Sequence, residues 1–135
     1  MNLDPLPNTR IHINDNGGMI MLFVCYPKCT TCKKAQGFLD AKAATYGFRD
    51  IKTENPTEAE LREWHVKSGL PLKRFFNTSG MQYRALGLSK KLPSMTEDEQ
   101  FALLATDGML VKRPILVCDD FVLVGFKEAE WEAKL

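Results

Sequence analysis

The chain has 135 residues and a formal net charge of +1, with 18 Lys and Arg against 17 Asp and Glu. This length fits one domain, which can fold without disulfide or metal staples. Hydrophobic residues make up 44% and charged residues 26%, a globular balance that excludes collagen, coiled coil and disorder. The near-neutral charge and short apolar runs predict no direct nucleic-acid contact and no membrane span. Without a signal-type segment, we expect a cytoplasmic location.

Residues 1–18 differ in composition from the rest of the chain. They contain two prolines, four asparagines and a closing Gly17-Gly18 pair, and they show neither strand nor helix periodicity. We expect them to form a poorly ordered leader or a remnant of an expression vector. Residues 19–135 are then expected to form a single domain.

The first elements predict a β–α–β unit. Residues 20–26 are a continuous apolar run ended by a proline, which is typical of a strand buried on both faces. A helix is expected to begin near Thr30 and to end near Gly47, with Ala43 on its buried side. A short strand is expected over 48–51. This order predicts that the two strands are parallel.

The middle of the chain has the signals of several helices. Thr57 with Glu60 and Thr96 with Glu99 form two capping boxes, each of which marks the start of a helix. The second helix is expected to carry apolar residues as far as Met109. Between the two, turn signals predict short helical pieces.

The chain ends with two strands and a helix. Apolar residues at 114–118 and 121–124 flank a two-residue turn, which predicts an antiparallel hairpin, and 127–135 has the pattern of an amphipathic helix. The order βαβ, helices, ββα predicts an α/β protein with a mixed sheet. Its plan is thioredoxin-like, with an inserted helical subdomain.

Four cysteines carry most of the functional signal: Cys25, Cys29, Cys32 and Cys118. Cys29 and Cys32 have the CxxC spacing, which in a reducing cytoplasm indicates redox or metal chemistry. The pair lies where the first strand ends and the helix begins, so backbone N–H groups and the helix dipole stabilise a thiolate there. We expect Cys29 to attack a substrate and Cys32, one turn later, to resolve the mixed disulfide.

Two other interpretations of the CxxC pair remain open. A structural zinc site needs about four ligands, and His12 and His65 are the only histidines that could complete one. Alternatively, the two cysteines are buried and inert, because free Cys is among the most buried residue types. Cys25 and Cys118, each inside an apolar strand, fit this inert interpretation.

Three segments resemble the arsenate reductase (ArsC)-like family, which includes the Spx-type redox regulators. They are Y-P-K-C-T-T-C-K-K-A at 26–35, F-F-N-T-S-G-x-x-Y-R-A-L-G-L at 75–88 and K-R-P-I-L-V at 112–117. The resemblance covers 21–135. It implies a thioredoxin-like fold with an inserted helical subdomain.

The resemblance also implies roles for two further residues. Pro114 is expected to follow a cis peptide bond and to lie against the cysteine pair. Arg113 is expected to direct its guanidinium at the thiolate or at an oxyanion, since the fork of donors matches an arsenate-like group. Together with Cys29 and Cys32, Arg113 completes the expected catalytic set. The other residues expected to contact substrate are Lys28, Thr30, Thr31 and Asn77.

The chain departs from the arsenate reductases of this family, which use a single nucleophilic cysteine and a group of arginines. Asn77 and Gly125 stand where two of those arginines are expected, and Arg113 alone remains. One arginine and a helix terminus would bind a tetrahedral dianion weakly. The resemblance therefore favours a thiol–disulfide oxidoreductase that acts on a small thiol or protein disulfide, with arsenate as a further candidate substrate.

Such an enzyme would hold no bound cofactor and would take electrons from an external thiol of glutathione, thioredoxin or glutaredoxin type. The alternative function is an Spx-type redox-sensing transcriptional regulator that binds the RNA polymerase α subunit. By the same resemblance, that contact would map to residues 52–56.

Overall fold

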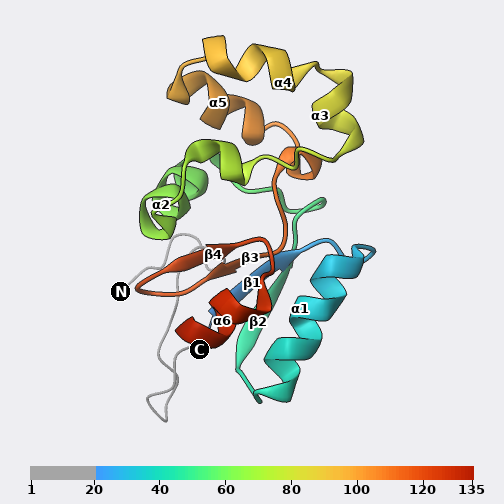
Figure 1. The fold of residues 1–135 in the computed structure, drawn as a ribbon, viewed down its shortest axis with the longest axis vertical. Helices are drawn as coiled ribbons and strands as arrows, with labels where there is room; N and C mark the ends of the chain where they lie inside the picture. The colour runs from blue at the N-terminus through green and yellow to red at the C-terminus, as the bar shows by residue number, and fades with distance from the viewer. Residues whose placement is uncertain (1–20) are drawn as a thin grey trace, which may run out of the picture.

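The computed structural model describes residues 21–135, and its sheet has four strands in the order β2-β1-β3-β4 (Figure 1). β1 is parallel to β2 and antiparallel to β3, which is in turn antiparallel to β4, so the expected mixed sheet and terminal hairpin are confirmed. The leader expected over 1–18 lies outside the described residues. The strands are β1 (Met21–Cys25), β2 (Tyr46–Asp50), β3 (Ile115–Val117) and β4 (Val122–Val124).

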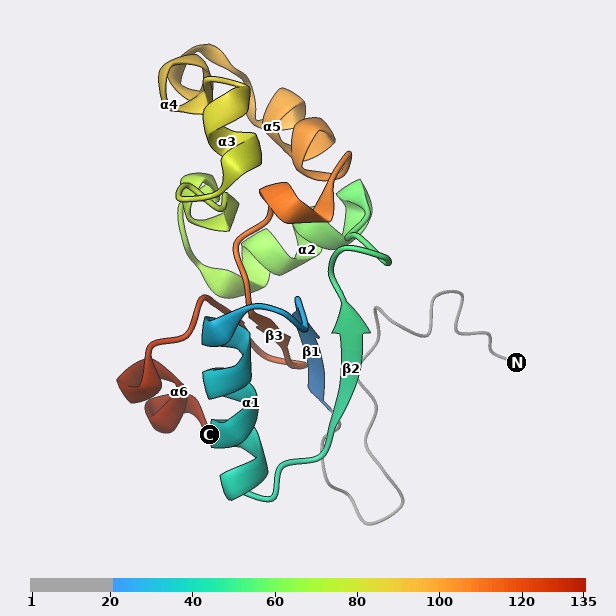
Figure 2. The same ribbon diagram turned by 90° about the vertical axis from the view of Figure 1, so that its right-hand side faces the viewer.

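Helices make up the rest of the described chain. α1 (Thr30–Ala41) and α6 (Glu128–Lys134) lie on the same side of the sheet (Figure 2). The insertion between β2 and β3 forms the upper part of the molecule in both views. Its helices are α2 (Glu58–Ser68), α3 (Met81–Ala85), α4 (Leu88–Lys91) and α5 (Glu97–Leu104), with short 3-10 turns η1 (Leu72–Phe75), η2 (Leu92–Ser94) and η3 (Gly108–Leu110). Within 21–135, none of the helices is both long and apolar enough to cross a bilayer.

β1 is buried on both faces, as its unbroken apolar run predicts. Successive side chains of a strand point to opposite faces. Leu22 and Val24 therefore join the core under the helical insertion, while Phe23 and Cys25 join a second core with α1 and α6. The strand thus holds together two layers, and its carboxyl end emerges between them.

The second core is closed by the C-terminal helix. The Trp131 indole is fully buried, and its ring makes edge contacts with Phe23, Phe38 and Phe126. Its Nε1 donates a hydrogen bond of 3.0 Å to the Gly125 carbonyl. The N–H of a buried Trp usually has such a partner. α6 is therefore fixed against α1 rather than attached only by the chain.

The predicted end of α1 is wrong. The helix ends at Ala41, not near Gly47, and Ala43 is exposed rather than buried. Ala43 takes a left-handed conformation with φ 55°, and the N–H that follows it donates to the Leu39 carbonyl, which caps the helix. Gly47 instead lies in β2 opposite Leu22, where the Leu22 side chain packs close to it.

Both capping boxes are confirmed. Thr57 accepts a hydrogen bond from the Glu60 N–H at 3.1 Å, and the Glu60 carboxylate accepts one from the Thr57 N–H at 2.9 Å; Thr96 and Glu99 repeat the arrangement. Each box satisfies two N–H groups at the start of its helix. The two boxes fix where α2 and α5 begin.

The predicted extent of the second helix is wrong. α5 ends at Leu104, and Met109 lies in the separate turn η3, which Asp107 caps by accepting a 2.8 Å hydrogen bond from the Met109 N–H. Gly108 approaches the Ile51 carbonyl so closely that a Cβ would collide with it. η3 is therefore docked against the segment that follows β2, which a continuous helix would prevent.

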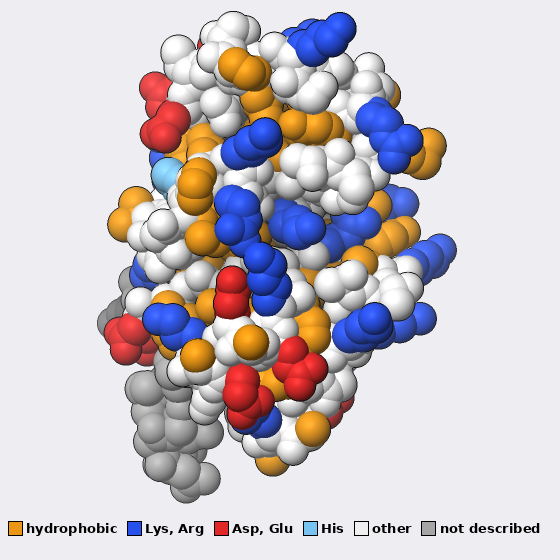
Figure 3. Space-filling model, viewed as in Figure 1, with side chains coloured by type: hydrophobic (Ala, Val, Ile, Leu, Met, Phe, Trp, Pro, Cys, Tyr) orange, Lys and Arg blue, Asp and Glu red, His pale blue; other side chains and the backbone are white. Residues whose placement is uncertain are grey.

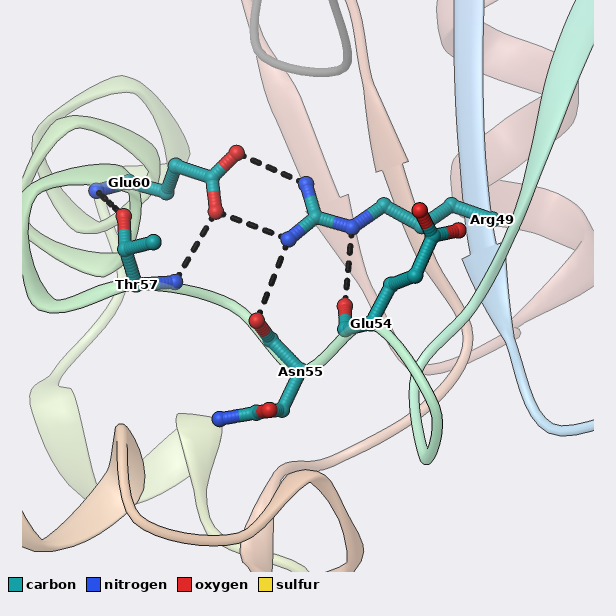
Figure 4. A network of polar contacts seen from close by, with 5 residues as sticks. All are labelled: Arg49, Glu54, Asn55, Thr57 and Glu60. Atoms are coloured by element: carbon teal, nitrogen blue, oxygen red, sulfur yellow. Dashed lines mark hydrogen bonds and ion pairs between the residues drawn. The ribbon is translucent and has the colours of Figure 1, made fainter. Parts of the chain in front are cut away.

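A buried ion pair ties β2 to the insertion (Figure 4). The Arg49 guanidinium makes two hydrogen bonds of 2.7 and 2.9 Å to the Glu60 carboxylate, and these side chains are only 5% and 4% exposed. Arg49 also donates to the carbonyls of Glu54 (2.9 Å) and Asn55 (3.2 Å). The segment between β2 and α2 is thus held in one conformation.

Candidate functional site

Cys29 stands at the N-cap of α1, as expected. Its backbone N–H donates to the Tyr26 carbonyl at 2.9 Å, and its side chain makes no capping hydrogen bond. The first N–H groups of a helix have no intrahelical partner and carry the positive end of the helix dipole. The half-buried Cys29 thiol therefore lies where negative charge is stabilised and where a substrate can reach it.

Cys32 lies one turn later and is buried, with 1% exposure. Its Sγ accepts a hydrogen bond of 3.3 Å from the Tyr26 N–H. A hydrogen bond with the Cys25 thiol, together with burial, raises the pKa of Cys32 well above its ordinary value, and a weaker hydrogen bond with Cys29 acts in the opposite direction. The two sulfurs of the CxxC pair are therefore unequal: one faces solvent and one faces the core.

A pocket of about 500 Å³ opens beside Cys29. Its walls are the start of α1, most of the segment 77–82, Met109 of η3 and the residues just before β3. Among the described residues that line it, the charged ones, Lys112 and Arg113, are both basic. Figure 3 shows Lys and Arg side chains gathered across the middle of this face, between the insertion and the sheet.

Arg113 is a lining residue with unused donors. Its Nε and Nη1 are buried and have no hydrogen-bond partner within residues 21–135. The guanidinium carbon lies 5.2 Å from the centroid of the Tyr26 ring. Buried donors are nearly always paired, and these two belong to a residue that lines the pocket. The Arg113–Pro114 peptide bond is cis, as expected.

The structure brings together part of the predicted set. Cys29, Thr31, Asn77 and Arg113 line the same pocket, and Cys32 lies behind Cys29. The other two predicted contacts, Lys28 and Thr30, are exposed and are not among the lining residues.

Lys112 is a site residue that the sequence reasoning missed. It lines the pocket directly before Arg113, and a Cβ on Gly125 would come within 3.2 Å of the Lys112 Cε. The Lys112 side chain therefore lies beside the glycine that replaces an expected arginine, and brings a cation to that neighbourhood. The sequence signal that could have identified Lys112 as a site residue is its place in the K-R-P motif. Met81 and Gln82 also line the pocket, but no sequence pattern marks them as site residues.

Of the two histidines that could complete a zinc site, His12 lies outside the described residues and His65 is engaged in packing. The His65 ring makes edge contacts with Phe75 and Phe101. Cys118 is fully buried, and burial raises its pKa to about 12, as expected for an inert thiol. Over residues 21–135, no group of three or more His, Cys, Asp or Glu is placed to hold a metal ion.

Fold and site together define a thioredoxin-like α/β protein with a helical insertion and a CxxC pair at the start of its first helix. The model of the ArsC family matches residues 25–134, and the chain belongs to this family.

The relatives of known sequence include an uncharacterized protein and a transcriptional regulator. The uncharacterized protein YusI of Bacillus subtilis is 49% identical, over 84% of this chain and 97% of the relative. The global transcriptional regulator Spx of Staphylococcus epidermidis is 26% identical, over 83% of each chain. Both matches span nearly the whole described region, so the insertion is shared along with the sheet.

Solved structures agree with the fold. An ArsC-family-related protein from Bacteroides fragilis is 57% identical, with a TM-score of 0.82 over 84% of this chain and 95% of that one. A protein from Streptococcus mutans described as a possible arsenate reductase is 46% identical, with a TM-score of 0.78 over 85% and 98%. The thioredoxin-like plan with a helical insertion is therefore confirmed.

Proposed function

We propose that the chain is a thiol–disulfide oxidoreductase of the ArsC family that acts in a reducing cytoplasm through Cys29 and Cys32. The observation that carries the proposal is the unequal placement of the two sulfurs. Cys29 is half-buried in a basic pocket at the start of α1, and Cys32 is buried directly behind it. This is the arrangement that a nucleophile and a resolving thiol require.

The reaction follows from this geometry. The Cys29 thiolate attacks one sulfur of a substrate disulfide, and the other half leaves as a thiolate that takes up a proton. Cys32 then loses its proton and attacks the Cys29 sulfur, which releases the second half as a thiol. Two electrons pass from the protein dithiol to the substrate. A glutathione-like thiol or a thioredoxin- or glutaredoxin-type protein restores the dithiol, without a bound cofactor.

The pocket favours a substrate with negative charge near its sulfur. Arg113 has two unpaired buried donors there, and Lys112 adds a second cation. A charge-assisted hydrogen bond contributes about 1.5–3 kcal/mol, which is enough to orient a carboxylate or an oxyanion. A small anionic disulfide fits this lining best. Arsenate is the second candidate, since it is an oxyanion of similar charge.

Alkylation of the purified, reduced chain at neutral pH tests the proposal. Iodoacetamide is expected to modify Cys29 first, because the thiols of Cys25, Cys32 and Cys118 are at most 1% exposed. If a local opening costs about 3 kcal/mol, it slows labelling about a hundredfold. Peptide mapping over time gives the four rates. Equal, slow labelling of all four thiols would contradict a reactive Cys29.

A second candidate function is redox-sensing regulation of RNA polymerase through its α subunit. The supporting observation is the segment 52–56. Lys52, Thr53 and Glu54 are exposed. The N–H groups of Lys52 and Thr53 donate to the Asp50 carboxylate. Arg49 donates to the Glu54 carbonyl, and Asn55 Nδ2 donates a 2.6 Å hydrogen bond to the Ala105 carbonyl. A rigid, exposed segment suits a protein contact, and the relative Spx is named a regulator.

Co-purification with the polymerase α subunit tests the regulator. Binding is expected to differ between the reduced and oxidised chain, because the CxxC pair would be the sensor. Reversal of the charge at Lys52 (Lys52→Glu) is expected to weaken capture, whereas Lys90→Glu, on the exposed side of α4, is the matched control. Capture of α subunit in neither redox state would exclude this function.

A further inference from the structure

Cys25 is a buried thiol for which the two-cysteine reaction has no use. It is the last residue of β1, is 1% exposed, and shares a core with Cys32 on the α1 side of the sheet. The Cys32 Sγ accepts its hydrogen bond from the N–H of Tyr26, the residue that directly follows Cys25. The carboxyl end of β1 and the first turn of α1 therefore meet at the Cys32 sulfur.

Cys32 has the other two thiols as neighbours. Hydrogen bonding with the Cys25 thiol raises the pKa of Cys32, and weaker hydrogen bonding with the Cys29 thiol lowers it. The first of these bonds lowers the pKa of Cys25, although burial and the charge of Asp50 oppose it. Cys25 therefore has a neighbouring sulfur to attack. The hydrogen bond that favours its thiolate belongs to the reduced chain, because Cys32 gives up its proton when the disulfide forms.

We propose that Cys25 is a third redox-active thiol, which takes over the Cys29–Cys32 disulfide by internal exchange. The inference rests on the proposed function, which supplies that disulfide. The Cys25 thiolate attacks the Cys32 sulfur; the Cys25–Cys32 bond forms and the Cys29–Cys32 bond breaks. Cys29 leaves as a thiolate. The proton that Cys25 gave up is balanced by the one that Cys29 can take up, so the exchange needs no oxidant or reductant.

The exchange has a clear consequence for the site. It moves the disulfide from the pocket into the core and restores a free thiol at the helix N-terminus. Cys29 can then attack a second substrate, or accept a protein partner, while the chain is still oxidised. A dithiol centre that stops at Cys29–Cys32 has no free thiol in the pocket once it is oxidised.

Cys118 serves as a matched control. It lies in the same core and is equally buried, but the charges that influence it are those of Asp119, Lys67 and Asp120 rather than those of the other cysteines. If buried thiols formed disulfides non-specifically during oxidation, Cys118 would form them as readily as Cys25.

Tryptic mapping of the oxidised chain distinguishes the two disulfides. Trypsin cuts after Arg10, Lys28 and Lys33, so Cys29 and Cys32 share the peptide 29–33 and Cys25 lies in 11–28. The full chain is treated with oxidised glutathione, quenched in acid, blocked with N-ethylmaleimide in denaturant and then digested. A Cys29–Cys32 disulfide leaves 29–33 as an internal loop. A Cys25–Cys32 disulfide joins 29–33 to 11–28 and leaves Cys29 blocked by the maleimide.

We expect the joined species to appear after the looped one and to grow at its expense. A looped 29–33 with Cys25 fully blocked by the maleimide would overturn the inference and leave the proposed function standing. Absence of both species would contradict the proposed function and this inference with it. Joining of 11–28 or 29–33 to the Cys118 peptide in similar yield would also overturn the specific role of Cys25.

Two variants add a second readout. In the oxidised chain, Cys29 of the wild type is expected to react with iodoacetamide at least about ten times faster than Cys29 of Cys25→Ala, whose disulfide stays in the loop. Cys118→Ala is expected to behave like the wild type. Equal protection of Cys29 in all three oxidised proteins would show that no exchange takes place.

Discussion

Replacement of Cys29 by serine is expected to lower the rate of disulfide reduction at least about a thousandfold, as loss of a catalytic nucleophile does in other enzymes. A serine hydroxyl in the same place stays protonated and does not attack sulfur. Because Cys32 is 1% exposed, it cannot replace Cys29 as the attacking group. The measurement is thiol release from oxidised glutathione, with a thioredoxin- or glutaredoxin-type protein as the reductant.

Cys32→Ser is expected to fail at a different step. Cys29 still attacks, but no thiol behind it resolves the product, so the mixed disulfide between Cys29 and substrate accumulates. Intact-mass spectrometry then shows the chain plus one substrate half. Cys118→Ser is the control, since its thiol is buried away from the pocket. Full activity in Cys29→Ser would remove Cys29 from the mechanism.

The same variants decide between disulfide and arsenate as substrate. Arsenate-dependent oxidation of a thiol donor by the wild type, lost in Cys29→Ser, would assign arsenate reduction to this chain. Activity with disulfides alone would agree with Asn77 and Gly125 standing where arginines are expected. The lining cations Lys112 and Arg113 are present for either substrate.

Arg49→Ala is expected to lower the free energy of unfolding by about 3–5 kcal/mol, the usual cost of removing one partner of a buried ion pair. The Glu60 carboxylate, 4% exposed, would be left as an unpaired buried charge. The carbonyls of Glu54 and Asn55 would lose their donor as well. Urea unfolding followed by Trp fluorescence measures the loss, since Trp64 lies next to the pair.

Arg62→Ala provides the comparison. Arg62 also pairs with two carboxylates, those of Glu58 and Asp98, but all three side chains are exposed. Exposed pairs are well solvated, so their loss is expected to change stability far less. If Arg49→Ala and Arg62→Ala were equally stable, the buried pair would not hold the insertion against β2.

The sequence predicted the elements well where a local pattern decides the structure. The apolar run of β1, the two capping boxes and the terminal hairpin were all readable. The end of α1 was not, because a glycine is the usual stop signal, whereas here the helix ends at Ala41 and Ala43, just beyond it, takes the left-handed conformation. Gly47 lies in β2 instead, opposite Leu22 in the sheet.

The candidate site was readable only in part, for a similar reason. The CxxC spacing and the position at a helix N-terminus follow from neighbours in sequence, and so does the K-R-P segment. The position of the Lys112 side chain beside Gly125, and the contact of Cys25 with Cys32, depend on how separate elements pack. The burial of Arg49 likewise depends on Glu60 of another element lying opposite it.

The pocket beside Cys29 is built from both halves of the molecule. One wall belongs to the sheet layer at the start of α1, and the other belongs to the insertion, which joins that layer through residues 51–56 and 111–114. A ligand that touches both walls adds to the contacts that already join the halves, which are the core under the insertion and the Arg49–Glu60 pair. By thermodynamic linkage, the binding energy of this ligand opposes separation of the two halves. As the pocket fills with substrate, the resistance of the insertion to heat and to proteases is therefore expected to rise.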